Sequence, residues 1–355
     1  MPRPAAEFFP ALPPRARVLV LDLGFLGDAI HLIPALAAIR RALPQARLEV
    51  MVAEHVQGIL AVCPWLDGVR GYPRFPKGPR WHQDLGRVRR LREEKFDVVV
   101  NLNGSDRSSL LTRATGAPLR LARVPPKVPW FWPRCFTHTV DVPHGTQPLF
   151  RQRWDALGAA GFPLPAEGPA FPIEIPSATA QKLDYLLAGV GPFVHVSPFA
   201  TQDAKQLPAP VLAEFLNAAR AVHPEISIVI STAPTKREKE QLADLRRRLD
   251  FAPAGVFAGE LDLVELAGLV QRARAHLGAD SGALHVALMT GTPTLSWFRD
   301  YPGRVEWQPA GPGHRSVLGR PTPDGLADIT VAQLLSALTA VLTAPAPARV
   351  PPFRP

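Results

Sequence analysis

Both halves of the chain carry the same order of hydrophobic and polar positions. In the first half, an aliphatic run at residues 18–21 is followed by two glycines and then by apolar residues at helical spacing, Ile30, Ile33 and Leu36. Uninterrupted aliphatic runs are typical of strands buried in a parallel sheet, and a 3.6-residue period is typical of helices. This stretch therefore predicts a strand, a tight turn over residues 24–27 and a helix.

The second half repeats this order near its end. We expect a strand end at 275–279, a turn at 280–282, a short helix at 283–289 and a strand at 294–298. Further strands are expected at 47–52, 96–101, 119–124, 193–197 and 226–231, and further helices at 85–95, 108–114, 144–157, 182–187, 210–223, 235–249, 263–272 and 331–342. Alternating strands and helices indicate an α/β fold with parallel sheets, so we expect two facing Rossmann-like domains with a cleft between them.

Length and proline content suggest where the domains divide. A chain of 355 residues fits two domains, and its 41 prolines gather in connections, because proline is excluded from central strands and helix interiors. The proline-rich stretch 167–176 is the best candidate for a linker. We expect an N-terminal domain at 1–176, a C-terminal domain at 177–343 and a proline-rich tail at 344–355.

Composition favours a cytoplasmic protein. No apolar stretch is long enough for a transmembrane helix, and the N-terminal residues lack the apolar core of a signal peptide. Cys63 and Cys135 lie far apart in the sequence, so we expect free thiols in a reducing compartment, and no Cys/His spacing typical of a metal site occurs.

The chain is basic, with a formal net charge of +9. A charge of this sign favours polyanionic partners, which include phosphorylated glycans, anionic lipids and nucleic acids. Two proline-rich segments mix cations with aromatic residues, which suits phosphate binding, a membrane interface or stacking on single-stranded nucleic acid, although a plain solvated surface remains an alternative. Their cations are Arg74, Lys77, Arg80, Arg120, Arg123, Lys127 and Arg134, and their aromatic residues are Tyr72, Phe75, Trp81, Trp130, Phe131 and Trp132.

Asp28 follows the first predicted strand and turn. In open parallel sheets, ligands bind at the carboxyl ends of the strands, and Asp28 is expected at that edge. A carboxylate there can cap the helix by accepting a free backbone N–H, or it can take a proton from a substrate hydroxyl. Local sequence leaves both roles open.

The predicted turn at 280–282 directly precedes the predicted helix at 283–289. Ser281, Gly282 and the free N–H groups of a helix start form a site suited to phosphate, although a plain helix cap is the alternative. Lys205 follows a loop of small residues, and its charge can offset that of a leaving phosphate, unless it is an ordinary surface lysine. His31 and His285 each lie on an apolar helix, where a histidine is usually a packed core residue.

Three segments in this order resemble glycosyltransferase family nine, the bacterial lipopolysaccharide heptosyltransferases. They read LGDAIHLIPAL at 26–36, HVSPFATQDAKQLP at 195–208 and DSGALHVALMTGTP at 280–293. The second segment departs from the family motif at Gln206 and Leu207, which follow the lysine. The resemblance implies a GT-B fold, built from two facing Rossmann-like domains, whose last helix crosses back to the first domain.

The resemblance also implies roles for individual residues. Asp28 would be the catalytic base and Lys205 would contact the donor phosphates, with Asp280 near the sugar. The implied donor-binding residues are Asp280, Ser281, Gly282, His285 and Glu238, with Glu240 an equal rival to Glu238, and the implied acceptor-binding residues are Gly27, Arg74, Lys77, Arg80 and Arg123.

The activity implied is an inverting, metal-independent transfer of heptose from ADP-heptose to the lipopolysaccharide inner core, without a cofactor. The expected partners are that nucleotide sugar, a phosphorylated lipid-linked acceptor and the inner face of the inner membrane, with no nucleic acid. One alternative is a GT-B enzyme with another acceptor or donor. A dinucleotide-dependent oxidoreductase would need G-x-G-x-x-G after the first strand, where this chain has only Gly24 and Gly27. A non-enzymatic polyanion-binding protein is the last alternative.

Overall fold

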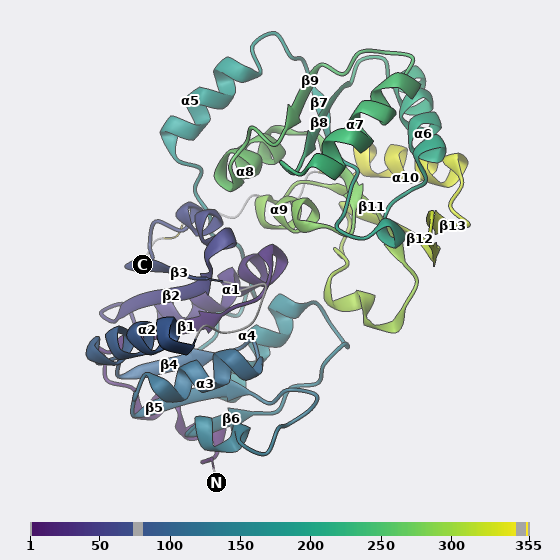
Figure 1. Cartoon of the computed structure of the whole chain (residues 1–355). Helices are drawn as coiled ribbons and strands as arrows, with labels where there is room; N and C mark the ends of the chain where they lie inside the picture. The colour runs from purple at the N-terminus through teal and green to yellow at the C-terminus, as the bar shows by residue number, and fades with distance from the viewer. Residues whose placement is uncertain (1, 74–80, 346–352, 354–355) are drawn as a thin grey trace. The chain divides into compact units, whose positions relative to one another are not determined.

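The structure, a computed structural model, describes residues 2–73, 81–345 and 353. The chain divides into two compact units (Figure 1). Unit 1 comprises residues 1–174 and 351–355, and unit 2 comprises residues 175–350. Each unit is a parallel sheet with helices packed on it, so the expected α/β fold class is confirmed.

The described residues of unit 1 form a six-stranded sheet in the order β3-β2-β1-β4-β5-β6, with every neighbouring pair parallel. This order, which reverses direction beside the first strand, is the Rossmann arrangement. The strands are β1 (Arg17–Asp22), β2 (Arg47–Ala53), β3 (Gly68–Tyr72), β4 (Val98–Asn101), β5 (Leu119–Arg123) and β6 (His138–Val140). The helices are α1 (Leu26–Ala42), α2 (Trp81–Glu93), α3 (Asp106–Ala114) and α4 (Leu149–Ala159), with 3-10 turns that include η3 (Glu54–Val62) and η4 (Trp132–Cys135).

The described residues of unit 2 form a seven-stranded sheet in the order β13-β12-β11-β10-β7-β8-β9. Only the β12–β13 pair is antiparallel. The strands are β7 (Phe193–Ser197), β8 (Ser227–Thr232), β9 (Gly255–Ala258), β10 (Ala275–Ala279), β11 (Thr294–Arg299), β12 (His314–Thr322) and β13 (Gly325–Ala327). The helices are α5 (Ser177–Leu186), α6 (Ala209–Val222), α7 (Lys236–Arg248), α8 (Leu263–Arg272), α9 (Gly282–Thr290) and α10 (Val331–Thr343), with 3-10 turns η5 (Asp203–Lys205) and η6 (Pro302–Glu306).

Burial explains why β1 and α1 form the centre of unit 1. All residues of β1 after Arg17 are buried, as a central parallel strand requires. Helix α1 packs on β1, η3 and α4, and it is buried almost all round from Ala29 to Arg40. These surroundings explain why most of its residues are apolar, and they place the start of α1 at the carboxyl edge of the sheet.

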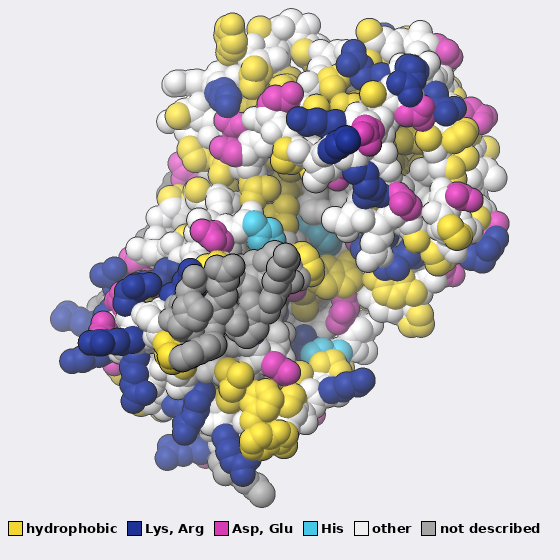
Figure 2. All heavy atoms as spheres, viewed as in Figure 1, with side chains coloured by type: hydrophobic (Ala, Val, Ile, Leu, Met, Phe, Trp, Pro, Cys, Tyr) yellow, Lys and Arg dark blue, Asp and Glu magenta, His cyan; other side chains and the backbone are white. Residues whose placement is uncertain are grey.

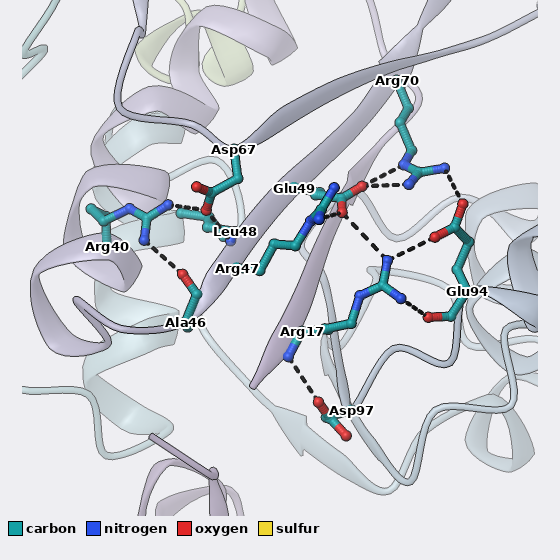
Figure 3. Close-up of polar contacts among 10 residues, drawn as sticks. All are labelled: Arg17, Arg40, Ala46, Arg47, Leu48, Glu49, Asp67, Arg70, Glu94 and Asp97. Carbon is teal, nitrogen blue, oxygen red and sulfur yellow. Dashed lines mark hydrogen bonds and ion pairs between the residues drawn. The ribbon is translucent and has the colours of Figure 1, made fainter. Parts of the chain in front are cut away.

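Several arginines of unit 1 are held by acids of the same unit (Figure 3). Glu49 on β2 is buried and forms ion pairs with Arg17, Arg47 and Arg70, at 3.6, 2.8 and 2.6 Å. Arg17 also donates to Glu94 at 2.7 Å, and this hydrogen bond holds the pKa of Glu94 below its ordinary value. These ion pairs therefore join the neighbouring strands β1, β2 and β3, and they offset most of the charge of the three arginines.

Helix α10 corrects one expectation. Its residues Leu334, Leu338 and Val341 are buried in the hydrophobic core of unit 2, where the helix packs on α6 and β12. The last helix was expected to cross back to the first domain, but its apolar face is already covered within unit 2. No helix among the described residues is long and apolar enough to span a membrane.

Candidate active site

The turn between β1 and α1 places the carboxylate of Asp28 at the carboxyl edge of the unit 1 sheet. Helix α1 begins at Leu26, so Asp28 is its third residue rather than its cap residue. The Asp28 Oδ2 atom accepts the backbone N–H of Phe25 at 2.9 Å. The side chain still exposes 17 % of its surface, so the cap leaves it accessible to a substrate.

Gly24 allows this position of Asp28. A Cβ atom on Gly24 would lie 2.4 Å from the Asp28 Cγ atom, which no pair of carbon atoms tolerates without a shift. The glycine is thus required by the close approach of the carboxylate to the turn.

Arg153, on α4, holds Asp28 from the other side. Its side chain is buried, and its Nη2 atom lies 3.5 Å from Asp28 Oδ1. The same guanidinium donates to the backbone oxygen of Asp28 and to the carboxylate of Asp22, the last residue of β1. Asp22 is buried as well, and its Oδ1 atom accepts a hydrogen bond from the Nδ2 atom of Asn103 at 2.9 Å. Residues from three elements therefore fix the start of α1.

A cavity of about 180 Å³ lies at the same edge of the sheet. It is lined by Leu23, Ala53, Tyr72, Ser105 and Arg107, which follow or end the strands β1 to β4. The Arg107 guanidinium makes no ion pair or hydrogen bond with another described residue. The cavity therefore presents an uncompensated positive charge where an open parallel sheet binds ligands.

In unit 2, Lys205 and Asp280 lie together although they are 75 residues apart in the sequence. Lys205 ends η5, which follows β7, and Asp280 follows β10, the neighbour of β7 in the sheet. The Lys205 Nζ atom lies 2.7 Å from Asp280 Oδ2, and the two side chains expose 21 % and 7 % of their surface. This pair marks the carboxyl edge of the second sheet.

The start of α9 lies beside that pair and is suited to an anion. Ser281 is the N-cap residue, yet its side chain caps nothing, and its Oγ atom is buried without a hydrogen-bond partner among the described residues. The first backbone N–H groups of a helix also lack partners within the helix. A hydroxyl, free amides and Lys205 together match the oxygens of a phosphate group.

Tyr301 belongs to the same surroundings. Burial raises the pKa of its hydroxyl, and the negative charge of Asp280 raises it further. The hydroxyl therefore stays protonated and can donate a hydrogen bond near Asp280.

Two further facts concern metals and thiols. Among the residues that the structure describes, no group of three or more His, Cys, Asp or Glu side chains is arranged to hold a metal ion. Cys63 and Cys135 are free and buried, as expected, and burial raises the pKa of both thiols.

Comparison with known families decides the identity. Residues 86–320 match the model of glycosyltransferase family 9 (heptosyltransferase), which is more than half of the chain. The chain belongs to glycosyltransferase family 9. It is a glycosyltransferase, and neither the oxidoreductase nor the non-enzymatic alternative is supported.

Curated relatives and solved structures agree with this family 9 assignment. The chain is 23 % identical to lipopolysaccharide heptosyltransferase 3 of Escherichia coli, over 80 % of this chain and 84 % of that protein. It is 27 % identical to lipopolysaccharide heptosyltransferase 1 of Pseudomonas aeruginosa, over 86 % and 82 %.

Two solved structures have the same fold. The family 9 glycosyltransferase of Veillonella parvula superposes with a TM-score of 0.76 at 19 % identity, over 92 % of this chain and 97 % of that chain. The E. coli heptosyltransferase WaaC with ADP-2-deoxy-2-fluoro heptose gives 0.73 at 16 % identity, over 91 % and 99 %. The expected GT-B fold, built from two Rossmann-like domains, is confirmed.

The other histidine and glutamate residues predicted for the site of this family 9 enzyme lie in different surroundings. His285 is buried on α9 with its ring edge-on to Trp307, 5.6 Å between centroids. Glu238 lies in the first turn of α7, where its Oε2 atom accepts the N–H of Ala233 at 2.7 Å, whereas Glu240 is mostly exposed. His31 is a core residue whose Nδ1 atom accepts the N–H of Phe150.

Of the residues predicted to bind the acceptor, the structure describes Arg123 and Gly27. Arg123 is buried, and its guanidinium donates to the backbone oxygens of Val142 and Pro143, at 3.2 and 3.1 Å, and to Gln152. This differs from the expectation that Arg123 contacts an acceptor, because its guanidinium is buried and hydrogen-bonded inside unit 1. Gly27 is buried within α1, and Arg74, Lys77 and Arg80 lie outside the described residues.

Sequence reasoning missed Asp22, Asn103, Arg153 and Tyr301. Asp22 ends β1, and an acid at a strand end is a usable signal. Arg153 is 131 residues from Asp22, and nothing in its local sequence distinguishes it from the exposed Arg151 on the same helix.

Proposed function

We propose that this family 9 enzyme transfers a heptose from ADP-heptose to the inner core of lipopolysaccharide, with inversion at the anomeric carbon. The relatives support this acceptor class, since they are lipopolysaccharide heptosyltransferases. The similar solved structures with ADP and with an ADP-heptose analogue support the donor. In this proposal, residues 177–343 bind the donor and residues 1–176 bind the acceptor.

The observation that carries the proposal is the cluster of Lys205, Asp280 and Ser281 at the start of α9. Lys205 and the α9 amides would bind the diphosphate of the donor, and the buried Ser281 hydroxyl would donate to a phosphate oxygen. Asp280 would then face the sugar rather than the phosphates, because its charge repels them. In this arrangement Lys205, the Ser281 hydroxyl and the α9 amides would hold the diphosphate with protein groups alone, so we propose a transfer that needs no metal ion.

Asp28 is the proposed base. The acceptor hydroxyl attacks the anomeric carbon as the bond from that carbon to the phosphate oxygen breaks. The Asp28 carboxylate takes the hydroxyl proton, and ADP leaves with the bonding electrons and an added negative charge. Lys205 and the α9 amides offset that charge as it develops. Because attack and departure occur on opposite faces, one displacement inverts the configuration.

For the acceptor, Arg107 joins the earlier candidates Arg74, Lys77 and Arg80. Its uncompensated guanidinium lines a cavity at the edge of the sheet from which Asp28 projects. A phosphate or carboxylate of the inner core would pair with it in bidentate fashion. The buried Arg123 is left out of this set.

Incubation of the enzyme with ADP-heptose and a panel of truncated core acceptors, followed by mass spectrometry, tests the proposal. We expect one acceptor to gain the mass of a single heptose, with ADP released in equal amount. A parallel thermal-shift screen of ADP-, UDP- and GDP-sugars identifies the donor class. A shift with UDP-sugars only, or no heptose transfer to any acceptor, would overturn the proposal.

A further inference from the structure

Arg299 lies at the same edge of the unit 2 sheet as the proposed donor site. It is the last residue of β11, which pairs in parallel with β10, and Trp297 lies beside Ala279 in that pairing. Asp280 and Ser281 directly follow Ala279, and helix α9 begins after Ser281. Arg299 is two residues beyond Trp297, so it lies beside the turn that carries Asp280 and Ser281.

No acid offsets the charge of Arg299. Its Nε atom is buried without a hydrogen-bond partner among the described residues, and its guanidinium makes no ion pair with a described Asp or Glu. The guanidinium instead lies over the ring of Tyr301, with 5.3 Å between the Cζ atom and the ring centroid. A contact through the face of the guanidinium leaves the N–H donors at its rim available to a ligand.

Tyr301 connects Arg299 with Asp280. Burial raises the pKa of the Tyr301 hydroxyl, the charge of Asp280 raises it further, and the charge of Arg299 lowers it. A hydroxyl that responds to both charges lies within electrostatic range of both side chains. Arg299, Tyr301 and Asp280 therefore belong to one group of side chains at the carboxyl edge of the sheet.

Other cations near this edge are balanced by acids. Lys205 pairs with Asp280 at 2.7 Å, and Arg304 in η6 pairs with Asp300 at 2.8 Å. Unit 2 as a whole has 16 Lys and Arg residues and 16 Asp and Glu residues, and Figure 2 shows the two kinds interspersed on the visible face of this unit. Arg299 differs from Lys205 and Arg304 because no ion pair offsets its charge.

The proposed donor site needs a further positive charge. A nucleoside diphosphate carries several negative charges, whereas the paired side chains of Lys205 and Asp280 have no net charge together. The free amides at a helix start are equivalent to only about half of one positive charge. These groups alone would leave most of the diphosphate charge uncompensated.

We propose that Arg299 is the second cation of the donor site and that its guanidinium pairs with the diphosphate of the bound sugar nucleotide. This inference rests on the proposed function, because it adds a residue to the same site. The planar guanidinium matches two phosphate oxygens at once, which a Lys ammonium cannot do. During transfer, Arg299 and Lys205 together offset the negative charge that develops on the departing nucleoside diphosphate.

Titration calorimetry of the full chain with ADP tests this role of Arg299. Arg299→Met removes the charge and keeps a long side chain, so ADP should bind about 10- to 100-fold more weakly. Arg299→Lys restores the charge without the planar fork and should recover only part of the affinity. Added salt should weaken ADP binding less steeply in Arg299→Met than in the parent, because one charge pair is missing.

Arg315→Met is the matched control. Arg315 lies near the amino end of β12, which is parallel to β11, so it stands at the opposite edge of the same sheet. Its side chain is exposed, and its guanidinium donates to the backbone oxygens of Pro312 and His314. ADP affinity should therefore not change in this variant, and circular dichroism should show unchanged folding in all three variants.

The outcomes separate this inference from the proposed function. If the parent binds ADP and Arg299→Met binds it equally well, or with the same salt dependence, the role of Arg299 is refuted and the proposed function stands. Equal weakening by Arg299→Met and Arg315→Met also refutes that role. Binding of UDP or GDP in place of ADP refutes the proposed donor, and the same variants then test Arg299 with that nucleotide.

Discussion

The Arg153 guanidinium lies 3.5 Å from the carboxylate of Asp28 and also donates to the backbone oxygen of the same residue. Two contacts from one buried side chain fix both the backbone and the carboxylate of the proposed base. Because Arg153 comes from α4 and Asp28 from α1, the orientation of the base depends on how these two helices pack.

Arg153→Met should destabilise unit 1. The change leaves the carboxylate of Asp22 buried without its cation, which costs about 3 to 5 kcal/mol of unfolding free energy. Urea denaturation measures the loss. Arg151→Met on the exposed face of α4 is the control and should change stability little. A loss below about 1 kcal/mol for Arg153→Met would contradict the role given to this pair.

Gly24→Ala should reduce transfer without unfolding the protein. The added methyl group would lie 2.4 Å from Asp28 Cγ, so the carboxylate must turn away. A misplaced base costs on the order of 100-fold in kcat. Gly58→Ala is a matched control, since a Cβ atom there has no neighbour within 4 Å. Equal turnover of the two variants would show that the position of Asp28 does not matter.

Much of the fold could be predicted because its central elements are strongly patterned. The ranges expected for β7, β10 and α8 are those observed, since the two strands are mostly buried and the helix is half-buried and begins at a capping box. Strands β3, β6, β9, β12 and β13 were missed. Strand β3 contains two glycines, β6 and β13 have only three residues each, β9 is half-buried throughout, and β12 has a single buried residue, so none shows a clear hydrophobic pattern.

Some residues of the candidate site could likewise be predicted from the sequence, and others could not. Asp28, Lys205 and Asp280 could be found because each follows a strand, and the carboxyl ends of parallel strands meet at one edge. The burial of Arg123 and the role of Arg153 could not be found, because both depend on backbone and side-chain groups far away in the sequence. Pairing over such distances is set by tertiary packing alone.

Lys205→Met should weaken ADP binding. The substitution removes the cation that pairs with Asp280 beside the start of α9 and leaves the side chain volume nearly unchanged. A charge-assisted hydrogen bond of this kind is worth about 10- to 100-fold in the dissociation constant. Titration calorimetry measures the change, with the exposed Lys239→Met as control. Unchanged affinity would remove Lys205 from the donor site.

Unit 2 should lose stability in mild acid. His195 and His276 are fully buried on β7 and β10, with their Nδ1 atoms 2.9 Å apart. Burial lowers the pKa of His195 to about 3 and holds that of His276 well below its ordinary value. Both rings are therefore neutral in the folded state at pH values where the unfolded chain binds protons.

The direction of the change in stability with pH follows from this difference in proton binding between the folded and unfolded states. Stability is full above the unfolded pKa of about 6.5 and falls as the pH decreases toward 3, by up to about 1.4 kcal/mol per pH unit for each histidine. Urea midpoints measured between about pH 7 and pH 4 check this slope. His195→Gln should reduce the slope, whereas the exposed His144→Gln should not. A flat profile for the parent protein would contradict the burial of two neutral rings.

The central claim is that Asp28 takes the acceptor proton during heptose transfer. Asparagine at this position can still accept the Phe25 N–H, so Asp28→Asn should fold and bind ADP as the parent does. The direct measurement is the rate of transfer from ADP-heptose to a truncated core acceptor, followed by mass spectrometry. We predict a loss of about 100- to 10,000-fold in kcat with unchanged ADP affinity. Transfer by Asp28→Asn at a rate within about twofold of the parent would contradict the account.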